Sequence, residues 1–432
     1  MVLTTVDQAV YRARRTPSGP VHLNLMFREP LIPDDLGEGL SAPDRWSASG
    51  EPYTRYAATR PAVDAGEVEY LREALRPVKR GLVVAGRLSS REQGEAVLRL
   101  ADSIGWPLLP DVGSQIRLGT HADSLVPHYD ALLASEQFKG AHAPQAVLHL
   151  GGRAVSKRLE RFLEISRPDP YVVVRENPFR LDPGHRVTHS IEAEVLDLCA
   201  ALAKVAGSDA RVDFSWMKSW REASERVDAC LDRSFAGAKE LNEPLVARLI
   251  SRQIPEGHAL VVASSMPVRD LDTYAASDGG YIPVAANRGA SGIDGTVATA
   301  AGFARGSGRP LTLLIGDLAL LHDLNSLAML RDLPIVVVVL NNDGGAIFSF
   351  LPIARYESYF EPFFGTPHGV SFEHAAAMFG LDYGQPRTAT EFVETYRAAC
   401  ERDTPALIEV RTDREENVAL HRRLLEEISE VL

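Results

Sequence analysis

The fold is decided by residues 311–352, which read LTLLIGDLALLHDLNSLAMLRDLPIVVVVLNNDGGAIFSFLP. LTLLI and PIVVVVL are short, continuous apolar runs, typical of strands that are buried on both faces of a parallel sheet. The intervening HDLNSLAMLRD is helix-competent, so we expect a strand–helix–strand unit with a right-handed crossover. Similar alternation elsewhere predicts an α/β protein built on doubly wound parallel sheets.

Polar residues follow both of these strands. Asp317 ends the first strand, and Asn341–Asn342 end the second. Parallel strands end at the same edge of a sheet, so these side chains should converge in the crevice where open α/β sheets bind ligands. One carboxylate, one amide oxygen and the carbonyl of Gly344 form a set of hard oxygen ligands that suits Mg²⁺ shared with a diphosphate. The alternative is that Asp317 caps the following helix and that Asn-Asn-Asp-Gly-Gly is only a turn.

The same segment resembles the thiamine diphosphate motif, in which Gly-Asp-Gly is followed after some two dozen residues by Asn-Asn. Here Leu318 replaces the third glycine, and 22 residues separate it from Asn341. GDLALLHDLNSL, NNDGGAIFSFLP and NRGASGIDG resemble one family in particular, 2-succinyl-5-enolpyruvyl-6-hydroxy-3-cyclohexene-1-carboxylate synthase. VHLNLMFREPL near the start and GGRAVSKRL in the middle extend the resemblance over nearly the whole chain.

That resemblance implies a thiamine diphosphate-dependent transferase of menaquinone biosynthesis. Such an enzyme decarboxylates 2-oxoglutarate and adds the resulting succinyl-semialdehyde carbanion to isochorismate. The cofactor is the electron sink, while the protein binds, orients and supplies electrostatics. The resemblance also implies Mg²⁺ (or Mn²⁺) as the ion that anchors the diphosphate, held by Asp317, Asn342 and Gly344.

The resemblance assigns roles to further residues, position by position. Those expected to bind the cofactor are Ser265, Ile293, Gly316, Asp317, Leu318, Asn342, Gly344 and Ile347. Those expected to bind substrate are Arg269, Arg288, Lys157, Phe348 and Leu351. Both substrates are dicarboxylates, so the cationic side chains would act as charge-matched clamps. Arg288 is further favoured because glycines close to it allow the backbone to approach a ligand.

These residues also have structural interpretations. Without the resemblance, Arg269 reads as a surface arginine in an exposed ion pair, Lys157 as a solvated lysine on a basic helix, and Ile293 as ordinary core. A hydrophobic helix start packed into the core is the alternative for Ile347, Phe348 and Leu351. His322 lies close to Asp317, but one histidine without a second ligand or an orienting acid does not indicate catalysis.

The start of the chain is expected to be the end of a further domain. GPVHLNLMFREPL, residues 19–31, reads as a last strand leaving a domain. In the resembled family a pyrimidine-binding domain comes before this point and supplies the glutamate that activates the cofactor. No residue here matches that glutamate, and Glu29 is not its counterpart, so no catalytic residue is assigned. Met1 would then be an internal start, or the chain a fragment or one half of a split enzyme.

Four regions are expected along the chain. Residues 1–30 are assigned to the C-terminal part of the pyrimidine-binding domain and 31–62, rich in Pro, Gly, Ser and Asp, to a linker. Residues 63–205 are assigned to a central α/β domain and 206–432 to a diphosphate-binding domain. Strands are expected in RGLVVAGR, AVLHLGG, PYVVVREN, HALVVASS, YIPVAANRG and PALIEVR, and helices in VDAGEVEYLREAL and WMKSWREASERVDACLDRSF. VVAGR lacks the full glycine fingerprint of a nucleotide-binding turn.

Composition limits the class of protein. A chain of 432 residues predicts two or three domains, and 45% apolar with 24% charged residues is ordinary for a soluble globular protein. A net charge of −12 disfavours nucleic acid or an anionic membrane as the main partner. Cys199, Cys230 and Cys400 imply neither a disulfide framework nor a zinc site. No run approaches the roughly 20 apolar residues of a membrane span, and no signal-peptide pattern occurs, so a cytoplasmic location is expected.

Three other functions remain open. Another thiamine diphosphate-dependent 2-oxo acid decarboxylase or synthase would share Asp317 and Asn342, but is not expected to combine GDL with NRGASGIDG. A catalytically incomplete chain would keep the diphosphate site and need a partner domain. An unrelated Mg²⁺- or nucleotide-binding module would prefer ATP to thiamine diphosphate. The expected partners are small-molecule substrates, and the resemblance implies a homodimer or homotetramer with active sites between chains.

Overall fold

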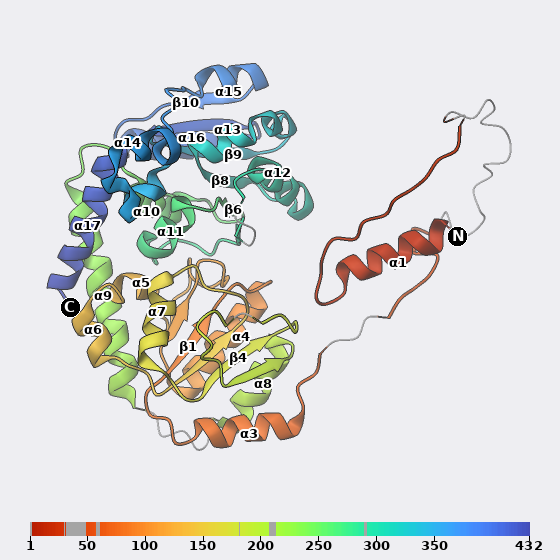
Figure 1. Cartoon of the computed structure of the whole chain (residues 1–432), viewed down its shortest axis with the longest axis vertical. Coiled ribbons are helices and arrows are strands. Elements are labelled where there is room, and N and C mark those ends of the chain that lie inside the picture. Colours follow the sequence, from red (N-terminus) through yellow and green to blue (C-terminus); the bar gives the residue numbers. More distant parts are fainter. Residues whose placement is uncertain are drawn as a thin grey trace.

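Two parallel β-sheets form the body of the protein. The structure is a computed structural model, and it describes residues 2–29, 31, 49–57, 61–180, 182–206, 213–288 and 292–432. The two sheets lie one above the other in Figure 1, and the N-terminal helix α1 (Val2–Arg14) stands apart from them. No helix in these ranges is both long enough and apolar enough to cross a membrane.

The first sheet has five parallel strands in the order β2-β1-β3-β4-β5. These strands are β1 (Gly81–Ala85), β2 (Leu108–Pro110), β3 (Ala146–Leu150), β4 (Tyr171–Arg175) and β5 (His189–Glu192). The helices between and around them are α3 (Ala65–Leu75), α4 (Arg91–Ile104), α5 (Tyr129–Leu132), α6 (Glu136–Ala141), α7 (Lys157–Ser166) and α8 (Val195–Ala206). Val83 and Ala85 pack with α3, α4 and α8 on one face of the sheet, while Leu82 and Val84 pack on the other.

The second sheet has six parallel strands in the order β10-β11-β9-β8-β6-β7. These strands are β6 (Ala259–Val262), β7 (Val284–Ala286), β8 (Leu311–Gly316), β9 (Ile335–Asn341), β10 (Asp382–Gly384) and β11 (Ala406–Arg411). Its helices include α10 (Glu243–Gln253), α11 (Met266–Tyr274), α12 (Thr296–Ser307), α13 (Asp317–His322), α14 (Glu357–Phe360), α15 (Glu373–Phe379), α16 (Ala389–Cys400) and α17 (Arg414–Glu430).

Both faces of the second sheet are covered, which explains the unbroken apolar strands. Along β9, Val336 and Val338 enter one hydrophobic core, while Val337 and Val339 enter the core on the opposite face. Successive side chains of a strand point to opposite faces, so a strand buried on both sides has apolar residues at most successive positions. The doubly wound α/β class predicted from the sequence is thereby confirmed.

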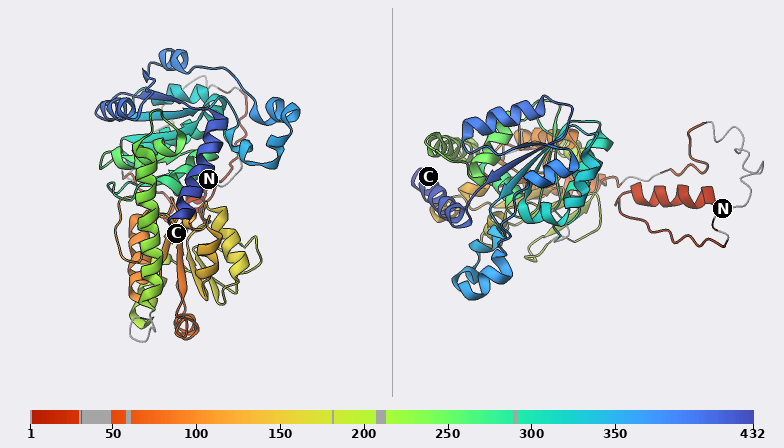
Figure 2. Two further views of the ribbon diagram at one scale, coloured as in Figure 1. Left: turned by 90° about the vertical axis from the view of Figure 1, so that its left-hand side faces the viewer. Right: turned by 90° about the horizontal axis from the view of Figure 1, so that it is seen from above.

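A long helix, α9 (Phe214–Ala236), ties the two sheets together. It runs along one side of the body past both sheets (Figure 2). The indole Nε1 of its Trp216 donates to the carbonyl oxygen of Gly81, at the start of β1, over 2.9 Å. Its buried side chains belong to one hydrophobic core that includes Leu82 of the first sheet and Val338 of the second. The two sheets are therefore joined by packed side chains as well as by the chain.

The strand–helix–strand unit of residues 311–352 forms as predicted, with one local difference. β8 and β9 are adjacent and parallel, and Gly316 lies opposite Leu340 in the register. The connection consists of the short helix α13 and a 3₁₀ helix, Leu324–Leu330, instead of a single α-helix. Asp323 lies at the break, where its carboxylate accepts from Ser326 Oγ and from the Ala298 amide. Such local side-chain bonds compete with continuation of an α-helix.

The predictions for other segments have mixed outcomes. All six further strands and both further helices predicted from the sequence are present, with small shifts of their ends. The short strands β2, β5 and β10 were not predicted. The expected strand at residues 19–31 was wrong, because the described residues there form no strand and Met26 and Phe27 are 91% and 77% exposed. An extended segment without a neighbouring strand has no partner for its backbone hydrogen bonds. Most of the expected linker, residues 32–48 and 58–60, lies outside the described residues.

Candidate functional site

Asp317, Asn342 and Gly344 come together at the carboxyl end of the second sheet. Asp317 follows β8 directly, and the other two follow β9. The Gly344 amide donates to Asp317 Oδ2 over 2.9 Å, and the Leu318 amide donates to Asp317 Oδ1 over 2.7 Å. Asp317 is only 1% exposed and Asn342 is 7% exposed. The convergence predicted from the βαβ unit is therefore present, and Gly316 and Leu318 flank it in the chain.

Gly344 has a conformation and a setting that other residues would not tolerate. Its φ angle is +134°, and a Cβ atom added there would lie 1.9 Å from the carbonyl oxygen of Gly365. Both the left-handed backbone and the close approach of a second loop require glycine. The Asn-Asn-Asp-Gly-Gly segment is thus more than a solvent-exposed turn, because it is packed against residues 364–366.

The side-chain oxygen of Asn342 is a buried hydrogen-bond acceptor at this edge of the sheet. Oδ1 of Asn342 is buried and accepts no hydrogen bond from any described residue. An unpartnered buried acceptor costs about 1–3 kcal/mol, so such an atom is expected to have a partner in the working protein. The described residues contain no group of three or more His, Cys, Asp or Glu that could hold a metal ion. A carboxylate, an amide oxygen and a backbone carbonyl nevertheless fit Mg²⁺, which takes few carboxylates and completes its shell with phosphate and water.

Two further side chains contact these ligand candidates, the partly buried His368 and the buried Glu243. His368 Nε2 lies 3.1 Å from Asp317 Oδ2. Glu243, the first residue of α10, accepts from Asn342 Nδ2 over 2.8 Å. Burial raises the pKa of Asp317, and the Gly344 amide and His368 oppose that shift. Burial likewise raises the pKa of Glu243 to about 7, with the Asn342 hydrogen bond acting in the opposite direction.

A cavity of about 580 Å³ lies between the carboxyl ends of the two sheets. From the first sheet it is lined by Arg87, Asp111, Gly113, Gly152, Arg153, Val155 and Arg175. From the second it is lined by Ser264, Ser265, Arg269, Val284, Ala286, Arg288, Gly292, Ile293, Ile347 and Phe348. Five arginines face one carboxylate in this set, so the cavity favours an anionic ligand.

The second-sheet side of the cavity has a strained backbone and a cation with few partners. Ser265 has φ +73° at the start of α11, a conformation that serine rarely adopts. Its carbonyl oxygen accepts from Arg269 Nη1. Burial lowers the pKa of Arg269, and the nearby charge of Arg288 lowers it further. The Arg288 guanidinium forms no hydrogen bond or ion pair with another residue of the described ranges, which leaves its donors for a ligand.

Eight of the residues predicted to bind cofactor or substrate line this cavity or its neighbour, whereas Gly316, Asp317, Leu318, Asn342 and Gly344 line neither. Ser265, Arg269 and Arg288 line the first cavity, and so do the apolar residues Ile293, Ile347 and Phe348. Lys157 and Leu351 line an adjoining cavity of about 440 Å³, which shares Arg269, Ile347 and Phe348 with the first. Leu351 is 47% exposed, so it lies at a rim and not in the core.

The arginines of the first sheet were missed by sequence reasoning. Arg87 follows β1, Arg153 follows β3, and Arg175 ends β4. The rule that ligands bind at the carboxyl ends of parallel strands applies to both sheets, and it would have identified all three. VVAGR was considered only as a nucleotide-binding turn, whereas Arg87 within it faces the cavity. Glu243 and His368 gave no comparable signal, because both reach the site from distant parts of the sequence.

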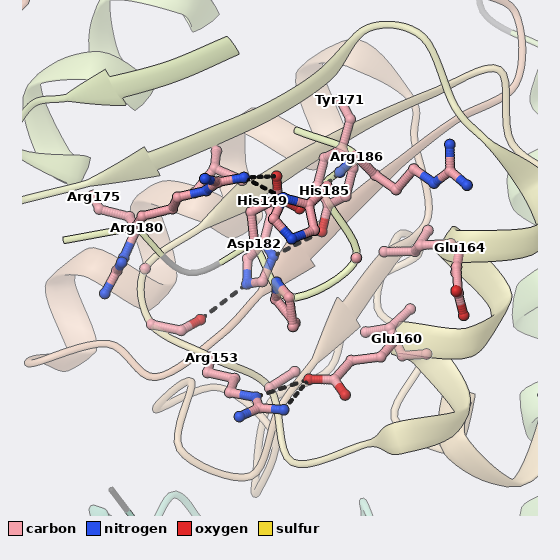
Figure 3. A pocket seen from close by; sticks show the side chains of 18 residues that line it. His149, Arg153, Glu160, Glu164, Tyr171, Arg175, Arg180, Asp182, His185 and Arg186 are labelled. Atoms are coloured by element: carbon pink, nitrogen blue, oxygen red, sulfur yellow. Dashed lines mark hydrogen bonds and ion pairs between the residues drawn. The ribbon is translucent and has the colours of Figure 1, made fainter. Parts of the chain in front are cut away.

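A third cavity, of about 380 Å³, lies within the first sheet's region and is drawn in Figure 3. His149, Tyr171, Arg180 and Arg186 are among the residues that line it, and the Arg153–Glu160 ion pair closes one side. His149 Nε2 lies 2.9 Å from the carbonyl oxygen of Gly152. Burial lowers the pKa of His149 to about 4, so the ring is neutral at physiological pH.

Comparison with known proteins gives two successive family matches along the chain. Residues 39–262 match the family model described as the middle domain of thiamine pyrophosphate, and residues 269–410 match that of the C-terminal TPP-binding domain of thiamine pyrophosphate enzymes. A protein of Rubrobacter xylanophilus named 2-succinyl-5-enolpyruvyl-6-hydroxy-3-cyclohexene-1-carboxylate synthase is 60% identical over 98% of this chain and 73% of its own length. The chain belongs to this synthase family.

Other members of the synthase family are less similar over the same span. The protein of that name from Salinibacter ruber is 50% identical over 98% of this chain and 72% of its own length. The one from Chlorobium phaeobacteroides is 40% identical over the whole chain and 74% of its own length. The middle-domain match ends with β6, although β6 pairs with β7 and β8 in the second sheet. The synthase-family chain is a thiamine diphosphate enzyme by both of its matched domains.

Proposed function

We propose that this protein takes part in menaquinone biosynthesis by decarboxylating 2-oxoglutarate and joining the remaining four-carbon fragment to isochorismate. The observation that supports this best is the pairing of an arginine-rich cavity with an acid–amide–glycine set at the same sheet edge. Both substrates are dicarboxylates, which arginine can grip with two parallel hydrogen bonds. Names of the related proteins point to the same reaction.

Asp317, Asn342 and the Gly344 carbonyl are proposed to hold Mg²⁺ or Mn²⁺ with the diphosphate. Thiamine diphosphate, when bound, supplies the carbanion chemistry that cleaves a 2-oxo acid and transfers its acyl part. Gly316 and Leu318 would lie beside the diphosphate. Ser265, Ile293 and Ile347 would position the rest of the cofactor in the cavity lining that they share.

The substrate carboxylates are proposed to bind the cations that surround the cavity. Arg288 and Arg269 would bind from the second sheet, and Lys157 from α7 in the adjoining cavity. Phe348 and Leu351 would form the apolar wall against the ring of isochorismate. Residues 63–205 would then present Lys157 to the substrate, while residues 206–432 would present Arg269 and Arg288 and also bind the diphosphate.

We further propose that the enzyme is a cytoplasmic homodimer or homotetramer. The segment around α14 projects from the body (Figure 2), and Gly365, shortly after α14, packs against Gly344. It exposes Tyr356, Tyr359 and Phe363 at 62%, 60% and 72%. Exposed apolar side chains clustered in this way are typical of an interface. All three cysteines are free thiols, which suits a reducing compartment. Light scattering of wild type and of a Tyr359→Glu/Phe363→Glu variant would test the assembly.

The reaction is tested with 2-oxoglutarate labelled at C1, the carboxylate bonded to the keto carbon, together with thiamine diphosphate and Mg²⁺. We expect release of labelled carbon dioxide and, with isochorismate present, formation of the joined product. Faster turnover of pyruvate would instead indicate another 2-oxo acid decarboxylase or synthase. Calorimetric binding of thiamine diphosphate without turnover would favour a chain that needs a partner domain. Preference for ATP over thiamine diphosphate would overturn the proposal.

A further inference from the structure

Glu243 is a buried carboxylate placed directly behind the proposed metal ligands. It is 1% exposed and stands at the first position of α10, an 11-residue helix. The partial positive charge of a helix N-terminus favours a carboxylate there. Burial of an acid is nevertheless costly unless it is hydrogen-bonded, so its contacts indicate what it does.

One oxygen of this carboxylate, which belongs to α10, is contacted by residues that follow two different strands. Asn342 Nδ2, after β9, donates to Glu243 Oε1 over 2.8 Å. Thr412 Oγ1, after β11, lies 3.2 Å from the same oxygen. The other oxygen, Oε2, is buried and has no hydrogen-bond partner among the described residues. Glu243 therefore connects the start of α10 to the ends of two strands at the ligand-binding edge.

The contact with Asn342 fixes which way its amide points. In the structure Glu243 Oε1 accepts from the NH₂ group of the amide, and an ionised carboxylate, which has no donor, pairs with this group and not with the amide oxygen. The opposite rotamer would set two acceptors 2.8 Å apart. Asn342 Oδ1 consequently faces away from Glu243, and it is the buried oxygen without a partner described above. The amide oxygen of Asn342 is thus directed away from Glu243 even without a bound ligand.

We propose that Glu243 is a positioning residue for the metal site, acting through Asn342. It holds the amide so that Oδ1 is presented to the divalent cation together with Asp317 and the Gly344 carbonyl. Metal ligands generally depend on such hydrogen-bond partners, and loss of a partner typically lowers metal affinity by about 10–100-fold. This inference rests on the proposed function, because it assumes that the site binds a divalent cation with thiamine diphosphate.

The test is Mn²⁺ affinity, measured by electron paramagnetic resonance in the presence of thiamine diphosphate. We expect Glu243→Ala to weaken Mn²⁺ binding by about 10–100-fold, because Asn342 is then free to rotate. Glu243→Gln should retain affinity within a few-fold, since its amide oxygen can still accept from Asn342 Nδ2. Thr412→Val, which removes the other contact to the same oxygen, should have a smaller effect than Glu243→Ala.

If Glu243 served only to stabilise the fold, its variants would show a different pattern of Mn²⁺ affinities. If Glu243 acts through Asn342, then Glu243→Ala should cause no further loss of Mn²⁺ affinity in an Asn342→Ala background. If the two substitutions weaken Mn²⁺ binding independently, so that their fold losses multiply in the double variant, the inference is overturned. Wild-type Mn²⁺ affinity in Glu243→Ala would also overturn it. Should that variant fail to fold, Glu243→Asp shortens the side chain while keeping the charge, and it should still weaken Mn²⁺ binding. Failure of the wild type itself to bind Mn²⁺ with thiamine diphosphate would refute the proposed function instead.

Discussion

The first and second sheets are built alike, with parallel strands whose carboxyl ends border one cavity, yet different residues follow their strands. Arg87, Arg153 and Arg175 lie at the ends of β1, β3 and β4. A buried acid and a buried amide, Asp317 and Asn342, lie at the ends of β8 and β9. The first edge is suited to anionic carboxylates, whereas the second combines a candidate cation site with two further cavity arginines, Arg269 and Arg288. The same architecture thus carries different binding tasks according to the charge of a few loop residues.

The largest expected effect concerns the acid edge. Asp317→Ala should weaken binding of thiamine diphosphate with Mg²⁺ by at least about 100-fold, because it removes the only carboxylate proposed as a ligand. Asp332→Ala, at an exposed position of the same strand–helix–strand unit, is the matched control and should leave binding within about twofold. Isothermal titration calorimetry measures both. Equal affinities in the two variants would mean that the second sheet does not carry the cation site.

Glycine-to-alanine substitutions at the two sheet edges can be compared by their effect on the free energy of unfolding. Gly344→Ala should lower the free energy of unfolding by about 2–4 kcal/mol, because its Cβ would overlap the Gly365 carbonyl in a left-handed backbone. Gly302→Ala is the control, since it lies within α12 with open space around it and should stabilise the helix by about 0.5–1 kcal/mol. Urea unfolding gives both values.

Gly86 allows the same comparison at the first sheet. Its Cβ would lie 1.8 Å from the carbonyl oxygen of Gly152, so Gly86→Ala should also be destabilising. If both edges are packed in the same way but bind differently, only Gly344→Ala should weaken Mg²⁺–thiamine diphosphate binding in the folded protein. A similar loss in Gly86→Ala would show that the two edges do not act separately.

The arginines provide the next smaller effect. Arg288→Ala should weaken 2-oxoglutarate binding by about 10–100-fold, which corresponds to one or two lost charged hydrogen bonds. Arg87→Ala should weaken it by a smaller factor and leave cofactor binding unchanged. Arg305→Ala, on an exposed position of α12, serves as the control. Titration of each variant with 2-oxoglutarate, after saturation with cofactor, would reveal whether the first sheet takes part in substrate binding.

The smallest effect is a pH dependence confined to the first sheet. The folded pKa of His149 is lowered to about 4 by burial, so protonation favours the unfolded chain, whose histidine titrates near 6.5. The contribution of neutral His149 to the free energy of unfolding is fully present above about pH 6.5 and is lost as the pH falls towards 4. A full shift corresponds to about 3 kcal/mol, and partial exposure of the ring reduces this to about 1 kcal/mol.

His149→Gln is the variant that tests this pH dependence. Its amide can donate to the Gly152 carbonyl as the neutral imidazole does, but it does not titrate. Wild type should therefore lose about 1 kcal/mol of stability relative to the variant as the pH falls from 7 to 4. A constant difference across that range would mean that His149 titrates normally in the folded protein.

Sequence patterns predicted the strands well because burial on both faces leaves a continuous apolar signal, as in β8 and β9. The same patterns placed Asp317 and Asn342 together, since parallel topology alone brings their strand ends to one edge. They failed for β2, β5 and β10, which are three or four residues long and too short to show a period. They failed also for Glu243 and His368, whose contacts depend on how α10 and a late loop pack. Ser265 showed no trace of its strained backbone in the sequence.

The core that α9 shares with both sheets has a consequence for unfolding. Neither sheet can expose its α9-facing side chains without exposing apolar surface that belongs to the other. Backbone amides of β1 and β9 should therefore exchange with solvent through the same global opening, as one cooperative unit. A ligand bound at either sheet edge would slow exchange in both sheets, because it stabilises the single folded state from which that opening begins.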